Sequence, residues 1–216
     1  MRETLDPENR RDLDPATIAS GYWRIARTPV TFGYTMATVF IQSGFTIYLA
    51  SSELLIGKIF DREEQFAIVF GTVAILFGAG AIINGRVVER LGIDRVVNRG
   101  FGLLASILVV LIAITVLSGG DPNFWLFMPV LGVTLSSYMF LMPNLNSAAM
   151  TPLGSIAGSG SALTGAVRMA LGAVIGGVIS EQVDTSVAPM VIGISVMSLL
   201  SGLSVWLVRV GEARRR

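Results

Sequence analysis

Six long apolar runs separated by short polar segments dominate the chain. They cover about 30–51, 65–84, 100–118, 124–146, 157–179 and 189–208. Each is close to the ~20 residues that an α-helix needs to cross the hydrocarbon core of a bilayer. Backbone groups in lipid must be satisfied internally, and the runs lack the two-residue alternation of barrel strands. The pattern therefore predicts an all-α integral membrane protein with six transmembrane helices.

Composition agrees with this picture and excludes several kinds of chemistry. The chain of 216 residues is 52% hydrophobic and 14% charged, with no cysteine and no histidine. Disulfides, thiolate or imidazole catalysis and Cys/His metal sites are therefore excluded for this chain. Its basic residues form no stripe with interleaved aromatics, so no nucleic-acid partner is expected. The spans hold one ionisable group of the Asp/Glu/Lys/Arg type, which is too few for catalysis, so we predict no enzyme and no catalytic residue.

The direction of the bundle follows from the placement of Lys and Arg. Thirteen of the 16 lie in the N-terminal segment, the loop between the second and third spans, and the C-terminal tail. Lys58 and Arg62 lie on the opposite side, among acidic residues. Because positive loops stay in the cytoplasm, we expect both termini there.

This orientation divides the chain into three parts. They are a cytoplasmic segment (1–28), a transmembrane bundle (29–208) and a cytoplasmic basic tail (209–216). The polar, acidic start lacks the features of a signal peptide, so no cleavage is expected. Asp14 and Pro15 are suited to begin a helix in the first part. That helix is either an interfacial anchor or a solvated linker.

The first and fourth spans are more polar than the others. The fourth is interrupted by Pro129, Gly132 and Pro143. In a bundle of two three-helix groups these two spans occupy matching positions, and paired, broken, polar spans point to the central site of a transporter. The candidate cavity residues are Tyr34, Thr38, Gln42, Phe45, Tyr138, Met142, Asn144 and Asn146. The alternative is that Pro and Gly only kink the helices and that the Asn side chains bond to neighbouring backbones.

The fifth span, "AGSGSALTGAVRMALGAVIGG", carries Arg168 near its middle. Exposure of this guanidinium to lipid would cost at least ~2.5–3.5 kcal/mol, so it should point into protein or a wet cavity. Small residues on the same face allow a close helix neighbour, and the candidates are Ser161, Gly165, Gly172 and Gly176. No acid lies inside a span. Either backbone carbonyls and neutral groups such as Gln42 or Asn144 satisfy Arg168, or its counter-charge lies outside the chain.

Three stretches resemble a known family. The run "MPNLNSAAMTPLGSIAGSGSALTGAVRMALGAVIGGVIS" resembles the region between the tenth and eleventh spans of the Bcr/CflA drug-efflux group of the major facilitator superfamily. "ETLDPENRR" is similar to that group's central cytoplasmic loop. "NGRVVERLGIDRVV" looks like the second copy of the superfamily's loop motif. Gly85, Glu89, Arg90 and Gly92 fit this motif, with Glu in place of Asp, whereas Ile93 and Asp94 depart from its basic pair.

The resemblance implies a fold and a function. The fold would be one half of a major facilitator, the C-terminal one, with its six helices arranged as a 3+3 inverted repeat. The function would be drug/proton antiport in the bacterial inner membrane, with export of small hydrophobic or cationic compounds. It requires no cofactor beyond a proton gradient. The acids that carry coupling in the family lie on early spans, which this chain would lack, so Arg168 would be a coupling or interface charge.

One six-helix bundle supplies one wall of such a transporter. The expected partners are the lipid bilayer, a small-molecule substrate, and a complementary six-helix half or a second copy of the chain. The alternative function is a non-transporting membrane remnant or a partner subunit that associates with another half. The sequence leaves open whether the chain is a fragment, a split-gene product or a self-pairing half.

Overall fold

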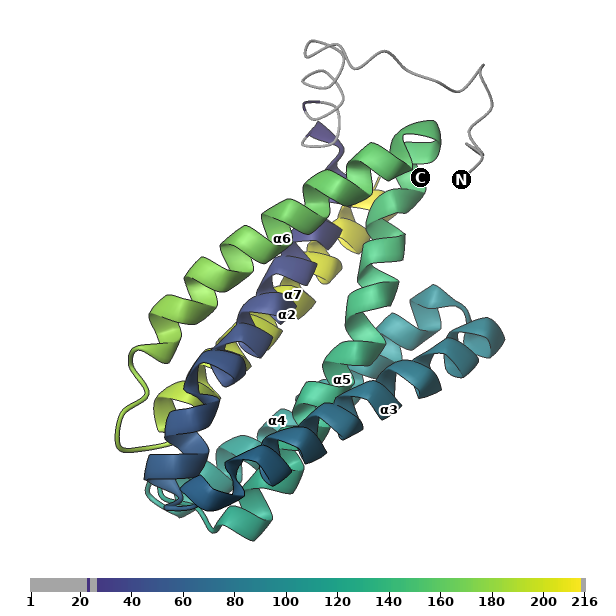
Figure 1. Cartoon of the computed structure of the whole chain (residues 1–216). Coiled ribbons are helices and arrows are strands. Elements are labelled where there is room, and N and C mark those ends of the chain that lie inside the picture. Colours follow the sequence, from purple (N-terminus) through teal and green to yellow (C-terminus); the bar gives the residue numbers. More distant parts are fainter. Residues whose placement is uncertain (1–22, 24–26, 215–216) are drawn as a thin grey trace, which may run out of the picture.

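The computed structural model describes Trp23 and residues 27–214, apart from the side chains of 155–157 and 159. The remaining residues, which include Asp14 and Pro15, lie outside the described part. Six long helices form almost all of it (Figure 1), and no strand occurs among the described residues. They are α2 (Pro29–Glu53), α3 (Phe66–Leu91), α4 (Ile93–Leu117), α5 (Phe124–Met150), α6 (Ala157–Ser180) and α7 (Ala188–Ala213). Each is long and apolar enough to cross a membrane. The predicted all-α membrane architecture with six spans is confirmed.

Short helical turns and specific end residues connect these helices. A π-helical turn, η2 (Leu54–Ile59), and a 3-10 turn, η3 (Glu63–Gln65), follow α2, and a second 3-10 turn, η4 (Thr151–Ile156), precedes α6. Gly92 alone separates α3 from α4, with φ of 77°, a left-handed conformation that favours glycine. The Asn123 side chain accepts a hydrogen bond from the backbone N–H of Trp125 at 2.9 Å and so caps α5.

The first span does not turn at Ser51–Ser52. The hydroxyl of Ser51 donates to the carbonyl of Ile47, and that of Ser52 to the carbonyl of Leu49. Both serines therefore stay within the helix. The chain reverses only after the π-helical turn η2.

The helices form two groups of three (Figure 1). In one group α2 packs against α6 and α7, and in the other α5 packs against α3 and α4. The groups meet through α2 with α5 and through α4 with α7. If the first three spans are exchanged with the last three, each of these pairings maps onto another or onto itself. The arrangement therefore fits the 3+3 repeat that the resemblance implies.

The two central helices, α2 and α5, are the most enclosed. More than half of the residues in the apolar stretch of each are buried. In α3 and α6 the buried share of that stretch is only 11% and 17%. The polar first and fourth spans thus form the middle of the bundle. The helices α3 and α6 flank them and expose most of their own surface.

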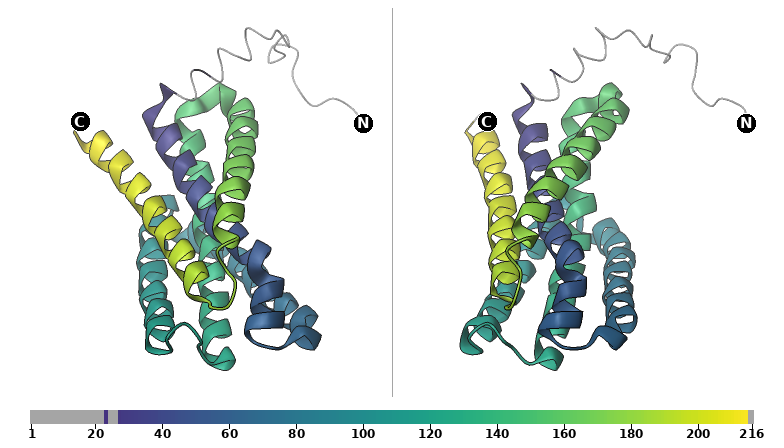
Figure 2. Two further views of the ribbon diagram at one scale, coloured as in Figure 1. Left: turned by 90° about the vertical axis from the view of Figure 1, so that its left-hand side faces the viewer. Right: turned by 60° about the vertical axis from the view of Figure 1, so that its left-hand side comes forward.

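The start of α2, the α3–α4 connection and the end of α7 lie at one end of the bundle (Figure 2). The loops that follow α2, α4 and α6 lie at the other end. Helix α7 continues as a helix to Ala213, so most of the basic tail is helical. The side chain of Arg209 in this region donates to Asn98 and lies 3.4 Å from the carboxylate of Asp94 on α4. The cytoplasmic assignment of this end remains a prediction from the positions of Lys and Arg.

Candidate functional site

The expected cavity residues lie on α2 and α5, but the structure gives them different surroundings. Tyr34, Thr38, Tyr138, Met142 and Asn144 are buried within the described bundle, and Gln42, Phe45 and Asn146 are half-buried. A buried side chain is held by its neighbours and does not reach a second wall without a rearrangement. The half-buried residues are therefore the ones best placed to meet a ligand or a partner.

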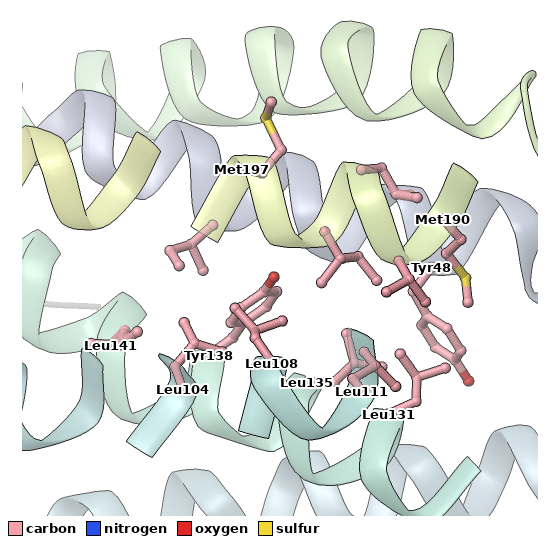
Figure 3. Packing of buried hydrophobic residues seen from close by; sticks show 14 of the residues in the cluster. Tyr48, Leu104, Leu108, Leu111, Leu131, Leu135, Tyr138, Leu141, Met190 and Met197 are labelled. Carbon is pink, nitrogen blue, oxygen red and sulfur yellow. The ribbon is translucent and has the colours of Figure 1, made fainter. Parts of the chain in front are cut away.

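Tyr138 is completely enclosed at the centre of the bundle. Figure 3 shows its hydroxyl directed toward α7, where it lies 3.0 Å from the hydroxyl of Ser198. Gly44 on α2 makes room for it, because a Cβ at that position would lie 2.5 Å from the phenol oxygen. Tyr138 thus joins α5 to α2 and α7.

Asn144 also turns toward the protein. Its amide nitrogen donates to the side-chain oxygen of Asn84 on α3 at 2.8 Å and to the backbone carbonyl of Phe140 at 2.6 Å. The second contact lies beside Pro143, which has no N–H for the helical hydrogen-bond ladder. Asn144 therefore links α5 to α3.

On α2 the expected cavity residues differ in exposure along the helix, since Tyr34 and Thr38 are buried whereas Gln42 and Phe45 are half-buried. Tyr34 is 5% exposed, and the hydroxyl of Thr38 donates to the backbone carbonyl of Thr35 at 2.7 Å. Further along, the ring of Phe45 stacks on that of Phe77 from α3, with centroids 4.8 Å apart. Phe45 therefore connects the two three-helix groups and keeps one side partly open.

Arg168 extends from α6 toward α5. Its Nη1 donates to the sulfur of Met142 at 2.9 Å, and its Nε is enclosed without an acceptor among the described residues. A thioether is a weak acceptor, so this charged group is poorly satisfied within the chain. Neither Gln42 nor Asn144, the neutral partners considered from the sequence, accepts a hydrogen bond from it in the described bundle.

The small residues of α6 fall into two sets. A Cβ at Gly172 would lie 2.5 Å from Cγ of Gln42, and a Cβ at Gly176 would lie 2.7 Å from the carbonyl oxygen of Ser43. Ser161 is exposed, and the space beside Gly165 is open among the described residues. Close packing against α2 therefore occurs in the second half of α6.

The loop-motif residues surround the α3–α4 connection. Gly85, Glu89 and Arg90 are exposed on the last turns of α3, and Gly92 forms the break. No described hydrogen bond or ion pair joins Glu89 or Arg90 to another element. The structure therefore shows the local geometry of the motif without an interaction that would assign it a role.

Three residues of this region were not predicted as site or packing residues from the sequence. Asn84 pairs with Asn144, Gly80 allows α3 to approach α5, and Thr35 is buried on α2. The spacing of Gly80 and Asn84 by four residues places both on one face of α3. That spacing was the available signal, although one small and one polar residue at this distance are common in membrane helices.

Comparison with known proteins gives one distant relative. The chain is 23% identical over 205 residues to a protein of Haemophilus influenzae named bicyclomycin resistance protein homolog. The aligned region covers 94% of this chain and 50% of the relative. The chain thus spans about half the length of the curated relative that it matches. No family model matches the chain, and no solved structure matches it.

Proposed function

We propose that this chain forms one six-helix half of a drug-efflux transporter of the major facilitator type. The supporting observation is the similarity along nearly its whole length to a resistance protein about twice as long. The arrangement of the helices agrees with this proposal, since α2 and α5 are central and α3 and α6 flank them. A second six-helix unit, either a different chain or another copy, would supply the other wall.

The half-buried group between α2, α5 and α6 is the substrate wall in this proposal. It contains Gln42 and Phe45 from α2, Asn146 from α5 and Arg168 from α6. A site of this kind combines apolar and aromatic surface with a few polar groups that set orientation. Export would be driven by exchange for protons, with the proton-carrying acids on the other unit, because the spans of this chain contain none.

A chimera with the Haemophilus relative tests this proposal directly. The segment of the relative that matches this chain is replaced by the chain, and the hybrid is expressed in a bicyclomycin-sensitive strain that lacks its own exporters. We expect the hybrid to raise the tolerated bicyclomycin concentration at least fourfold above the unmatched part of the relative alone. The increase should disappear when a protonophore collapses the proton gradient.

Two further results would separate the alternatives. Correct membrane insertion of the hybrid without resistance to bicyclomycin or to a panel of hydrophobic antibiotics would contradict the transporter proposal. If, in that case, the chain expressed separately still co-purified with the other part of the relative, the alternative of a non-transporting partner subunit would be favoured. Equal resistance from the chain alone would instead point to a second copy as the other wall.

A further inference from the structure

The middle of α6 holds a charged group without an adequate acceptor. Arg168 lies eleven residues after the first residue of α6 and twelve before its last, so its Cα is near mid-depth of the span. Its Nη1 meets only the sulfur of Met142, and its Nε has no acceptor in the described part of the chain. A guanidinium carries five N–H donors, and leaving enclosed donors unpaired costs free energy.

A second unpaired polar group lies on the facing side of α2. Thr35 is only 6% exposed, and its enclosed hydroxyl makes no hydrogen bond to any described residue. Other hydroxyls of the spans, such as those of Ser43 and Thr134, donate to the carbonyl four residues earlier in their own helix. The hydroxyl of Thr35 therefore lacks the hydrogen bond to its own helix that these other hydroxyls make.

The register of the two helices brings these groups to neighbouring levels. Helices α2 and α6 run in the same direction (Figure 1), and Gly172 lies at Gln42 while Gly176 lies at Thr46. The same offset of 130 residues sets Arg168 level with Thr38, less than one turn below Thr35. Thr35, Gln42 and Thr46 are spaced by seven and four residues, so Thr35 is on the face of α2 that contacts α6.

No acidic side chain of the described residues is placed to accept from Arg168. No Asp or Glu lies in any of the six spans, and the acids of the bundle lie at the helix ends. Lipid phosphates lie at the membrane surfaces, far from mid-depth. An acceptor at this depth would therefore have to be a group other than the described acids or a lipid phosphate.

We infer that Arg168 and Thr35 form a binding site for the carboxylate of a small, otherwise hydrophobic ligand. The planar guanidinium fork matches the two oxygens of a carboxylate, and the hydroxyl adds a third donor. Met142 on α5 adds apolar surface beside Arg168, and the ring of Phe45, which stacks on Phe77 of α3, adds more further along α2. The inference rests on the proposed function in treating this region as the substrate wall, and it adds molecules with an anionic group, zwitterions included, to the ligands that this wall would bind.

Ligand binding to the purified chain tests this site without any transport. The chain is placed in nanodiscs of uncharged phosphatidylcholine, and binding of dansylglycine is followed by its fluorescence. Its neutral analogue, dansylglycinamide, has the same ring system without the charge. We expect saturable binding of the acid, at least about tenfold tighter than that of the amide, because a charge-assisted hydrogen bond is worth about 1.5–3 kcal/mol.

Substitutions then assign the binding to the two residues. Arg168→Gln should weaken binding of the acid about tenfold or more and leave binding of the amide unchanged, and Thr35→Val should weaken it about threefold. The matched controls remove the same groups elsewhere. Arg62→Gln removes a guanidinium from the loop that follows α2, and Thr72→Val removes an exposed hydroxyl of α3. Neither control should alter the affinity. Thermal melting of every variant verifies that it is folded.

Two outcomes would overturn the inference. One is equal affinity for the acid and the amide in the unchanged chain, and the other is undiminished binding of the acid by a folded Arg168→Gln variant. Neither outcome bears on the resistance of the chimera, so failure here is distinguishable from failure of the proposed transport. Conversely, Arg168-dependent binding together with an inactive chimera would support the site and contradict transport.

Discussion

The α3–α5 and α6–α2 interfaces use the same packing device and differ in their polar groups. In each, a glycine of the flanking helix lies against a backbone carbonyl of the central helix, Gly80 at Ser136 and Gly176 at Ser43. Near the first contact, the amide of Asn144 donates a hydrogen bond to the side-chain oxygen of Asn84. Beside the second, Arg168 retains an unpaired nitrogen. Close packing thus does not require that every buried polar group be hydrogen-bonded, and the inferred carboxylate site depends on the unpaired group at the second interface.

The largest expected effect is the loss of close approach at the second interface. A Cβ on Gly176 would lie 2.6 Å from Cβ of Thr46 and 2.7 Å from the carbonyl of Ser43, so Gly176→Ala forces the backbones apart. Overpacking of this kind typically costs about 1–3 kcal/mol. We expect a clear drop in the melting temperature of the purified protein in detergent.

The first interface offers a weaker version of the same test. A Cβ on Gly80 would lie 2.9 Å from the carbonyl of Ser136 and 3.4 Å from the side chain of Met139, so Gly80→Ala should destabilise less than Gly176→Ala. Gly78→Ala is the matched control, since nothing lies within 4 Å of its added Cβ. An unchanged melting temperature for Gly176→Ala would contradict the idea that both interfaces depend on a glycine packed against a carbonyl. A larger loss of stability in Gly80→Ala than in Gly176→Ala would contradict it as well.

An intermediate effect is expected from breaking the amide pair. Asn144→Leu leaves the buried oxygen of Asn84 without its donor, and interhelical hydrogen bonds in membranes contribute about 0.6 kcal/mol on average, with a maximum near 1.7. A double-mutant cycle with Asn84→Leu measures the coupling free energy. A coupling free energy of zero would mean that the pair contributes nothing to the α3–α5 interface.

The smallest effect on stability is expected at Arg168. Because its guanidinium is poorly satisfied, Arg168→Gln should change the free energy of unfolding by no more than about 0.5 kcal/mol in either direction. The contrast with Asn144→Leu is the informative quantity: one substitution lowers stability and the other leaves it unchanged. A large destabilisation by Arg168→Gln would identify a structural arginine and remove the distinction between the two interfaces.

The sequence alone determined the membrane class, the number of spans and the presence of a solitary charge in the fifth. These follow from length and polarity, because a helix that crosses a bilayer needs a long apolar run and excludes charges. The more polar character of the first and fourth spans also pointed to their central position. Even the close-packing role of Gly172 and Gly176 was visible as a spacing.

The tertiary structure decided which polar side chains meet. In a membrane the lipid-facing and protein-facing sides of a helix are both apolar, so the pattern of hydrophobic residues specifies the rotation of each helix only weakly. Asn144 could therefore be assigned to a cavity from the sequence, although it pairs with Asn84, and Tyr138 likewise, although Gly44 and Ser198 enclose it. The neighbouring levels of Thr35 and Arg168 arise from the register of two helices 130 residues apart. Such a register depends on which backbones approach most closely, which is a property of the packed bundle and not of either segment.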